Sequence, residues 1–363
     1  MNFAARQAKL REHLASTRVD AFLISHLPNI RYLCGFTGSA ALLLVQESGS
    51  VFFSDVRYDT QAKEEVKGAK VVIARKPMQE AVADFFSGRR KTRGKGPILG
   101  IEADHLTVAE KKRLRKLLPS GTSLKDAAPN VERARMVKDS DEIEQIRSAV
   151  RLGAKIFDRG LEVLRSGVKE VEVAAEMELA ARRGGAEEMS FPTIIASGAR
   201  SALPHGRASM QSIPSGAFVV CDFGVILSGY CSDQTRTVWV GKVADDARHA
   251  YEAVRQAQQA SIDAVRPGIA VTEVDVAARK SLYKAGLGKY FTHSTGHGVG
   301  LEIHESPRVA AGQREILQPG MIITIEPGVY FPGKWGVRIE DMVVVTAGGC
   351  EVLTPTSKDL LAV

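Results

Sequence analysis

Residues 216–237 read GAFVVCDFGVILSGYCSDQTRT, and they carry the clearest structural signal in the second half of the chain. The run 218–222 is apolar up to its last residue and predicts a strand, and the glycines between 224 and 229 suit a hairpin turn. If the strands pair about a centre near residue 227 or 228, Asp222 and Asp233 face each other with Cβ atoms ~5 Å apart. Two such carboxylates repel unless a cation lies between them, although a solvent-facing acid pair is the simpler alternative.

A second stretch repeats this pattern further along the chain. Residues 320–328 read GMIITIEPG and align with GAFVVCDFG at 216–224, with a glycine at each end and an acid at the same place. Each half then continues to a second acid, Asp233 or Glu340. Glu326 belongs to the apolar strand that we expect over 321–326, where a carboxylate is rarely solvated. We therefore expect an internal duplication that brings four carboxylates to one cavity.

His297 adds an imidazole nitrogen to these carboxylates. It lies in STGHGVG, residues 294–300, where glycines let the backbone approach another group closely. Two Asp, two Glu and one His form an oxygen-rich donor set, which suits a pair of divalent ions ~3.5–4 Å apart, namely Mn²⁺, Co²⁺, Fe²⁺ or Zn²⁺. The candidate metal ligands are Asp222, Asp233, His297, Glu326 and Glu340.

Composition indicates an ordinary globular protein. The chain has 363 residues, of which 44% are hydrophobic and 25% charged, and its length suggests two domains. No apolar run approaches the ~20 residues that cross a bilayer, and charged residues near the N-terminus exclude a secretory signal. The 4 cysteines form no CxxC pair, which favours reduced thiols over disulfides or a zinc ribbon. We therefore expect a cytoplasmic protein.

The formal net charge of +7 comes largely from residues 89–138. Within this stretch, 89–96 indicates a flexible basic loop, and 109–118 indicates the solvated face of a helix. Few aromatic residues are interleaved there, and no helix-turn-helix, zinc-finger or RNP pattern accompanies the charge. The sequence therefore does not favour a nucleic-acid partner.

The two halves differ in the order of their predicted elements. Residues 1–137 alternate helices and strands, as is typical of an α/β domain. A helix with Ser140 as its N-cap and acids in its first turn opens the second domain, residues 138–363. Two helix pairs, each followed by strands rich in Val and Ile, are expected there, over 140–165 with 170–183 and over 244–265 with 271–285. In the first domain we expect a helix over 4–16 and strands over 21–25, 40–45, 51–53, 71–74 and 98–101.

Four stretches of the second domain resemble the pita-bread metallopeptidases, family M24, which include methionine aminopeptidase, prolidase and aminopeptidase P, with creatinase as a metal-free relative. They are 222–237 (DFGVILSGYCSDQTRT), 295–305 (TGHGVGLEIHE), 323–328 (ITIEPG) and 337–342 (VRIEDM). The first domain, with NIRYLCGFTGS at 29–39, resembles the N-terminal domain of the prolidase and aminopeptidase P branch. The resemblance implies an α/β domain of the creatinase/prolidase N-terminal type, followed by an α+β pita-bread catalytic domain with internal pseudo-duplication.

The resemblance also implies a role for each candidate ligand. Asp222 would chelate one of two divalent metal ions. Asp233 and Glu340 would bridge both ions, and His297 and Glu326 would complete the other. Mn²⁺ is the first choice of metal, with Co²⁺, Zn²⁺ and Fe²⁺ as alternatives. Because all five positions carry the family's ligand types, a metal-free creatinase relative and an inactive binding scaffold are both disfavoured.

Further residues are placed around the metals by the same resemblance. His205 would contact the scissile peptide bond, and His304 would stabilise the tetrahedral intermediate or move a proton. Glu326 is the expected proton acceptor. Taken one at a time, these histidines are better explained as half-buried structural residues. The remaining positions are His293 and Arg308, which would bind substrate, and Arg338, which would orient a bridging carboxylate.

The implied activity is hydrolysis of the bond between an N-terminal residue and a following proline. The sequence favours an Xaa-Pro aminopeptidase, because GFTGS at 35–39 looks more like aminopeptidase P, and an Xaa-Pro dipeptidase (prolidase) is the alternative. A strict dipeptidase needs a cation for the substrate's C-terminal carboxylate, and Arg308 and Arg314 are candidates. The implied partners are proline-containing peptides and a second copy of the chain in a homodimer, with no nucleic acid and no membrane.

Overall fold

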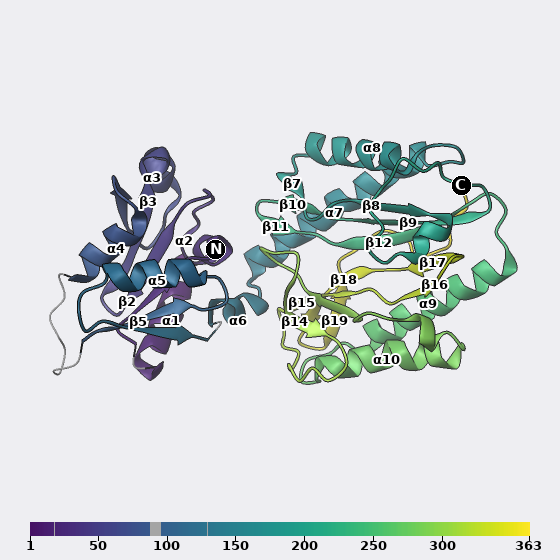
Figure 1. Ribbon diagram of the computed structural model, residues 1–363. Helices are drawn as coiled ribbons and strands as arrows, with labels where there is room; N and C mark the ends of the chain where they lie inside the picture. Colours follow the sequence, from purple (N-terminus) through teal and green to yellow (C-terminus); the bar gives the residue numbers. More distant parts are fainter. Residues whose placement is uncertain (18, 88–95, 129) are drawn as a thin grey trace. The chain divides into compact units, whose positions relative to one another are not determined.

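A computed structural model describes residues 1–17, 19–87, 96–128 and 130–363 of the chain (Figure 1). Residues 89–95 of the predicted basic loop lie outside the described residues. The chain divides into two compact units, Met1–Arg135 and Met136–Val363. Each unit has its own sheets and its own hydrophobic core.

The first unit contains one mixed sheet. Its strands are β1 (Ala21–Ile24), β2 (Leu42–Gln46), β3 (Gly49–Asp55), β4 (Lys70–Ala74), β5 (Ile98–Glu102) and β6 (Ser123–Ala127). They lie in the order β4-β3-β2-β1-β5-β6. β2 pairs antiparallel with β1 and β3, whereas the other pairs are parallel. The strands predicted in this half are all present, and the mixed sheet agrees with the expected α/β class.

Helices cover this sheet and close its core. They are α1 (Phe3–Thr17), α2 (Leu27–Cys34), α3 (Asp59–Glu65), α4 (Met78–Ser87), α5 (Val108–Leu117) and α6 (Asn130–Met136), with the short 3₁₀ helix η1 (Val56–Tyr58) before α3. Val82 and Phe86 of α4 pack with the strands in the core. On α5 only Leu114 is buried, so the basic residues of this helix face solvent as predicted.

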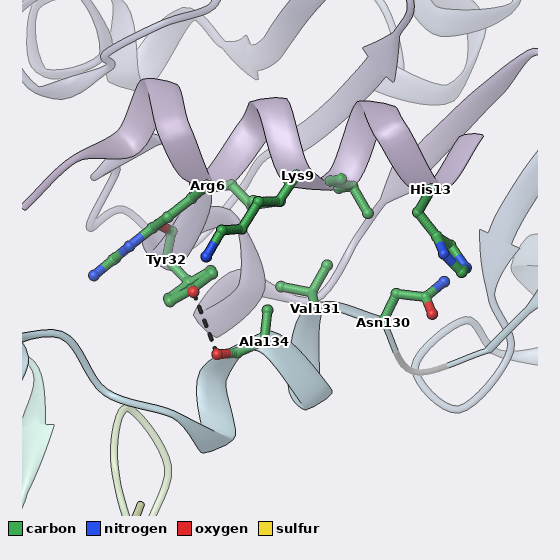
Figure 2. Close-up of a pocket in the computed structure, with 9 residues that line it drawn as sticks. Arg6, Lys9, His13, Tyr32, Asn130, Val131 and Ala134 are labelled. Atoms are coloured by element: carbon green, nitrogen blue, oxygen red, sulfur yellow. Dashed lines mark hydrogen bonds between the residues drawn. The ribbon is translucent and has the colours of Figure 1, made fainter. Parts of the chain in front are cut away.

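A buried arginine joins helix α1 to helix α2 of the first unit. Arg6 is 8% exposed, donates from Nη1 to the Tyr32 carbonyl oxygen at 3.0 Å, and lies 4.1 Å from the centre of the Tyr32 ring. Arg6, Lys9 and His13 share one face of α1 and line a cavity of about 180 Å³ together with Asn130 (Figure 2). This cavity contains none of the predicted site residues.

The second unit is built from two helix pairs with strands between them (Figure 1). The helices are α7 (Ser140–Val163), α8 (Glu170–Arg183), α9 (Asp245–Ala264) and α10 (Val271–Lys284), and α7 packs on α8 as α9 packs on α10. Each pair precedes its own set of strands, as expected of a duplication. Within the described ranges, no helix has both the length and the apolar character needed to span a membrane.

The strands of the second unit form several small sheets. They are β7 (Glu188–Met189), β8 (Ile194–Ser197), β9 (Ala217–Phe223), β10 (Val225–Leu227), β11 (Tyr230–Cys231), β12 (Gln234–Val240), β13 (Gly296–Gly298), β14 (Glu305–Val309), β15 (Ile322–Ile325), β16 (Gly328–Phe331), β17 (Trp335–Arg338), β18 (Asp341–Thr346) and β19 (Gly349–Val352), with the 3₁₀ helices η2 (Gly198–Ala202) and η3 (Gly288–Tyr290). Two of the sheets have the orders β12-β9-β8 and β14-β13-β15-β18-β19. The pairs β9–β12 and β15–β18 are the two hairpins that carry the predicted acids.

The first helix of this unit begins one residue away from the predicted cap. Asp139, and not Ser140, is the N-cap: its carboxylate accepts from the Glu142 amide at 3.0 Å, and the Glu142 carboxylate accepts from the Asp139 amide at 3.1 Å. This reciprocal capping box requires an acid three residues after the cap, which Asp139 has and Ser140 lacks. The prediction of Ser140 as N-cap is therefore wrong by one position.

The register of the first hairpin also differs from the prediction. Thr235, and not Asp233, lies opposite Asp222. The reason is the turn, where Ser228 and Gly229 both have positive φ, 52° and 78°, as a two-residue hairpin turn requires. Asp233 lies two residues before Thr235 and so points to the same face of the hairpin as Asp222. The two acids are diagonal neighbours instead of directly opposed residues.

In the second hairpin, Glu326 and Glu340 lie between two ladders. The β15–β18 ladder ends with Ile325 opposite Asp341, and the β16–β17 ladder begins at Gly328. Continuing the register places Glu326 opposite Glu340 in the gap. Glu326 therefore lies just past the apolar strand and not inside it, which corrects the prediction. The strand ends here because the next residue is a proline, which cannot donate a backbone hydrogen bond to a ladder.

Gly224 marks a point where two strands approach too closely for a side chain. A Cβ at this position would lie 1.9 Å from the carbonyl oxygen of Ser232. We therefore expect Gly224→Ala to lower the free energy of unfolding by about 3 kcal/mol, measured by urea unfolding. Gly348→Ala is the matched control, because none of the described atoms lies within 4 Å of the added Cβ. Equal stability of the two variants would contradict this close approach.

Candidate metal centre

One cavity of about 850 Å³ in the second unit brings the predicted site residues together. Acids from both hairpins reach it, together with histidines from β13 and from the loops around it. Apart from Arg314, the residues singled out from the sequence line this cavity: His205, Asp222, Asp233, His293, His297, His304, Arg308, Glu326, Arg338 and Glu340. Apolar side chains form another part of its wall, namely Phe191, Pro192, Ile194 and Ile303.

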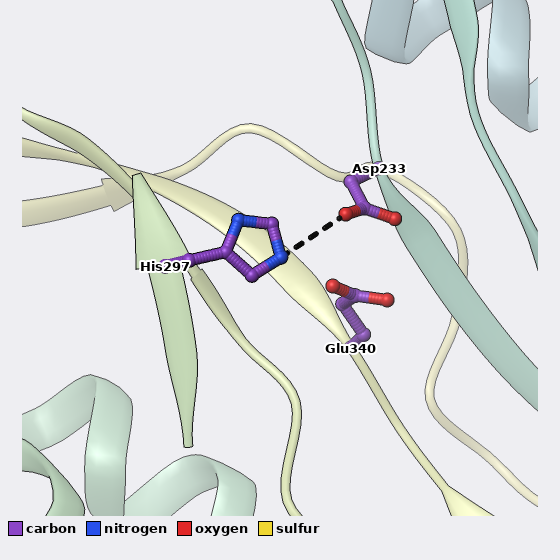
Figure 3. A group of neighbouring side chains, drawn as sticks. All are labelled: Asp233, His297 and Glu340. Carbon is purple, nitrogen blue, oxygen red and sulfur yellow. Dashed lines mark ion pairs between the residues drawn. The ribbon is translucent and has the colours of Figure 1, made fainter. Parts of the chain in front are cut away.

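Asp233, His297 and Glu340 lie close enough to share one cation. One ligand atom from each lies within 4.8 Å of the others, and Figure 3 shows the three side chains pointing toward one another. His297 belongs to β13, Asp233 immediately precedes β12, and Glu340 immediately precedes β18. Donor atoms that converge from one strand and from the residues just before two others form a preorganised site for a metal ion.

The imidazole of His297 presents a lone pair to two carboxylates. Its Nδ1 lies 3.0 Å from the carbonyl oxygen of Gly298, and because a carbonyl can only accept, Nδ1 carries the proton. Burial lowers the pKa of His297 to about 4, so the ring is neutral at pH 7. Its Nε2 lies 3.5 Å from an oxygen of Asp233 and 3.5 Å from an oxygen of Glu326. A lone pair facing two carboxylates calls for a cation between them.

Burial and mutual repulsion raise the pKa values of three carboxyl groups in this cavity. The pKa values of Asp233 and Glu340 lie well above the ordinary range, first because burial disfavours the charged form and second because of neighbouring carboxylates. Burial raises the pKa of Glu326 to about 8, although Arg338 opposes the shift. The cluster therefore cannot ionise fully at pH 7 without additional positive charge.

Asp222 offers an unsatisfied acceptor to the same cavity. Its Oδ2 accepts a hydrogen bond of 2.5 Å from Arg338 Nη2. Its Oδ1 is buried and has no hydrogen-bond partner in the described part of the chain. A buried acceptor without a partner costs about 1–3 kcal/mol, which a bound cation would offset. The donor set formed by Asp222, Asp233, His297, Glu326 and Glu340 therefore fits divalent metal ions.

Arg338 orders the carboxylate side of the cavity. In addition to Asp222, it donates to the Tyr330 hydroxyl at 2.7 Å and to the Thr235 hydroxyl at 3.2 Å. Thr235 in turn donates to Glu340 at 2.7 Å. The sequence predicts that Arg338 orients a bridging carboxylate, and its link to Glu340 runs through Thr235. Its direct partner is Asp222, which the resemblance gives as the ligand of a single ion.

The other histidines occupy different parts of the cavity. The His304 ring lies 4.4 Å from the His297 ring, at an angle of 65°. His293 is half-buried, and its Nδ1 donates to the carbonyl of the next residue at 2.7 Å. Its Nε2 therefore accepts from the Tyr330 hydroxyl, 2.9 Å away, and burial lowers its pKa to about 4. His205 is exposed in the loop that follows η2.

Tyr330 is a site residue that sequence reasoning missed. Its hydroxyl accepts from Arg338 and donates to His293, so it joins the carboxylate side of the cavity to the substrate side. The available signal was weak, because Tyr330 lies in the apolar strand β16 and tyrosine is common in strands. Only the long-range contacts of its hydroxyl distinguish it from a core residue.

A duplicated α+β unit that gathers an oxygen-rich donor set into one cavity defines a metallohydrolase of the pita-bread type. The Metallopeptidase family M24 model matches residues 144–347, and the Creatinase/Prolidase N-terminal domain model matches residues 6–137. The chain belongs to metallopeptidase family M24.

Similar proteins align with nearly the whole chain. The Xaa-Pro dipeptidase of Pyrococcus horikoshii is 37% identical over 358 residues, which cover 97% of this chain and 97% of the relative. A solved structure of an Xaa-Pro dipeptidase from Bacillus anthracis has a TM-score of 0.94 at 37% identity and covers 100% of both chains. An X-Pro aminopeptidase structure from Thermotoga maritima has a TM-score of 0.89 at 32% identity, with 99% of this chain and 100% of that chain covered. These likenesses confirm the expected fold class of both domains.

In the protein without divalent ions, the free energy of unfolding should decrease as the pH rises from 6.5 to 8. Glu326 has an ordinary pKa of 4.5 and a folded-state pKa of about 8, so in this range the folded state binds more protons than the unfolded state. The free energy of unfolding therefore decreases as the pH rises. The buried histidines act in the opposite direction, but only below about pH 6.5, where the unfolded imidazole gains a proton.

Thermal unfolding of chelator-treated protein at pH 6.5 and pH 8 measures this effect. Added Mn²⁺ should raise the Tm more at pH 8 than at pH 6.5, because protons compete with the metal for the carboxylates. Glu326→Gln should weaken the pH dependence of the metal-free protein, and Glu351→Gln, at an exposed site pairing with Arg147, is the control that should leave it unchanged. A metal-free Tm that rises over this range would refute the proposed repulsion.

Proposed function

We propose that this protein is an Xaa-Pro dipeptidase, a metal-dependent exopeptidase that releases an N-terminal residue from a C-terminal proline. The observation that carries the proposal is the complete donor set around one cavity, in a chain that aligns over nearly its full length with an Xaa-Pro dipeptidase. The sequence alone favoured an Xaa-Pro aminopeptidase. The comparisons favour the alternative, because the relatives with a stated Xaa-Pro activity are mostly dipeptidases or prolidases, two of them 37% identical, whereas the X-Pro aminopeptidase is 32% identical.

Two divalent ions are proposed to occupy the donor set. Asp222 would bind one ion, and His297 with Glu326 would bind the other. Asp233 and Glu340 would bridge the two. The unpartnered Oδ1 of Asp222 and the unprotonated Nε2 of His297 support this assignment. Oxygen-rich donors favour Mn²⁺, with Co²⁺, Zn²⁺ and Fe²⁺ as alternatives, and bound ions would supply Lewis acidity and lower the pKa of water toward neutrality.

Glu326 is the proposed proton carrier. It lies in the cavity, with an oxygen 3.5 Å from Nε2 of His297, where a carboxylate can exchange a proton with a bound water. Glu326 would accept the proton of the attacking water and deliver it to the proline nitrogen. This delivery is needed because the proline nitrogen leaves as a secondary amine and carries no proton in the peptide bond.

His304 and His205 are proposed to bind the carbonyl side of the scissile bond. Burial, together with His205, lowers the pKa of His304 and so favours its neutral imidazole. A neutral imidazole can donate one N–H to the oxygen that becomes negative in the transition state. His304 lies against the ring of His297 and so sits beside the proposed ligands. His205 reaches the same cavity from the loop after η2.

His304→Ala should lower kcat about 100-fold while the bound metal is retained, because the substitution removes an oxyanion donor and no proposed ligand. Steady-state kinetics with an Xaa-Pro dipeptide and elemental analysis of the purified variant measure the two effects. Asp233→Asn is the comparison, since loss of a bridging carboxylate should remove both metal and activity. Metal loss from His304→Ala equal to that from Asp233→Asn would make His304 a ligand and would overturn its proposed role.

Arg308 is the proposed partner of the substrate's C-terminal carboxylate. It lines the cavity and is exposed, and its side chain forms no hydrogen bond or ion pair with the described residues. A guanidinium group binds a carboxylate through two parallel hydrogen bonds. The apolar wall formed by Phe191, Pro192 and Ile303 would accept the proline ring beside it.

Ala-Pro should therefore be hydrolysed with at least a tenfold higher kcat/KM than Ala-Pro-Ala, because the longer peptide moves its carboxylate away from Arg308. Arg308→Gln should raise the KM for Ala-Pro and remove this preference. Arg314→Gln is the matched control, since Arg314 is exposed and does not line the cavity. If the wild-type enzyme prefers the tripeptide, the aminopeptidase alternative holds instead.

A further inference from the structure

The loop that carries His205 has little regular structure. Residues 198–216 join β8 to β9, and within this fully described segment η2 is the sole helix or strand. The loop brings His205 and Arg207 to the lining of the cavity. Backbone hydrogen bonds to residues 167–171 hold the end of the loop, residues 209–213, but no ladder holds the part around His205, whose position therefore depends on side-chain contacts as well.

Glu170, the first residue of α8, accepts hydrogen bonds from this loop and from Ser197, the residue before it. Its side chain is 0% exposed, so a carboxylate is fully buried here. Its Oε1 accepts from the amide and the hydroxyl of Ser197, both at 2.8 Å. Its Oε2 accepts from Arg200 Nε at 3.0 Å and from the amide and the hydroxyl of Ser209 at 3.1 and 2.7 Å. These donors fill both oxygens and offset the cost of burying the charge.

These anchors lie on both sides of His205 in the sequence. Ser197 and Arg200 precede it, and Ser209 follows it. Arg200 also connects Glu170 to the segment after His205, because its Nη2 donates to the carbonyl oxygen of Arg207 at 2.6 Å. The backbone amide of Glu170 adds a further bond to the loop, to the carbonyl of residue 211 at 3.0 Å. The segment around His205 is thus closed at both ends by one carboxylate.

On the cavity side, the same segment has a second anchor. Arg338 Nη1 donates to the carbonyl oxygen of Pro204 at 3.1 Å, and the hydroxyl of Ser201 accepts from the amide of Gly336 at 2.8 Å. Arg338 is the residue that also binds Asp222. The loop therefore has hydrogen bonds to Arg338, beside the proposed metal site, and to Glu170. His205 lies between the residues that make these two sets of bonds.

We propose that Glu170 is a positioning residue that holds His205 in place for the substrate, and this rests on the proposed function, in which His205 contacts the scissile bond. Glu170 does not line the cavity, so it acts only through the loop. Glutamine cannot replace it, because an amide has one acceptor oxygen and its NH₂ group would face the donors of Ser197 or of Arg200 and Ser209. A loosened loop would misplace His205 and leave the proposed metal ligands untouched.

A double-mutant cycle tests this inference in the metal-loaded enzyme. We expect Glu170→Gln to lower kcat/KM for an Xaa-Pro dipeptide about 10- to 100-fold, the size expected for a displacement of about 1 Å, with unchanged metal content. In the His205→Ala background the same substitution should cost less than about threefold, because the residue that it positions is already gone. Equal losses in the two backgrounds would overturn the inference.

Glu172→Gln is the matched control. Glu172 lies in the same turn of α8 and is exposed, and its carboxylate caps the helix through the Lys169 amide at 2.8 Å. It should change kcat/KM less than about twofold. Hydrogen exchange supplies a readout independent of activity: the amides of Ser197 and Ser209 should exchange faster in Glu170→Gln than in Glu172→Gln. Unchanged exchange at both amides would also overturn the inference.

Ser209→Ala serves if Glu170→Gln does not fold. It removes one hydroxyl donor from the Glu170 carboxylate and leaves the charge in place. A smaller loss of kcat/KM, again reduced in the His205→Ala background, would support the inference, and full additivity would overturn it. A wild-type enzyme without activity on Xaa-Pro dipeptides would instead overturn the proposed function, whereas the exchange experiment would still test the hold of Glu170 on the loop.

Discussion

Repulsion among buried carboxylates is the constraint on which the second unit depends. Asp222, Asp233, Glu326 and Glu340 share one cavity, and neighbouring negative charge helps to raise the pKa values of Asp233 and Glu340. Arg338 brings one positive charge and contacts only Asp222 among these acids directly. One guanidinium group cannot balance four carboxylates, and the remaining charge is what divalent ions would supply. The polypeptide must hold the acids together whether or not that charge is present.

The backbone meets this requirement by fixing each acid next to a paired strand. Seven residue pairs join β9 to β12, and the ladders β15–β18 and β16–β17 enclose Glu326 and Glu340 between them. Close backbone contact tightens the arrangement, since a Cβ on Gly296 would lie 1.9 Å from the Thr324 carbonyl oxygen. Moving the backbone under such a carboxylate would break ladder hydrogen bonds, so the carboxylate can relax away from its neighbours only by rotating its side chain. The duplicated hairpins thus hold an arrangement that is unfavourable without its cations.

Much of this organisation could be predicted from the sequence, because apolar runs and helical periodicity are local signals. The two helix pairs, the acid-bearing hairpins and the residues that line the cavity follow from such patterns and from the family resemblance. The register of Asp222 could not be predicted, because it depends on the positive φ angles of Ser228 and Gly229. Tyr330 and Glu170 were missed for another reason: their partners lie far away in the sequence, and a polar atom reveals its role only through those contacts.

Strands position the proposed metal ligands and loops position the other histidines, and this difference explains why buried polar contacts lie behind the cavity. The proposed metal ligands sit on or beside strands, where ladders fix them. His205 lies in a loop that lacks this support, and the exposed His304 lies at the end of another loop, immediately before β14. A loop can place a side chain precisely only if other bonds restrain it, and charge-assisted hydrogen bonds in a buried setting are the strongest available. Glu170 provides such bonds behind His205. The residue after His304, Glu305, forms a buried ion pair of 3.2 Å with Lys138, whose side chain is 1% exposed, so a buried charge also restrains the backbone next to the second histidine.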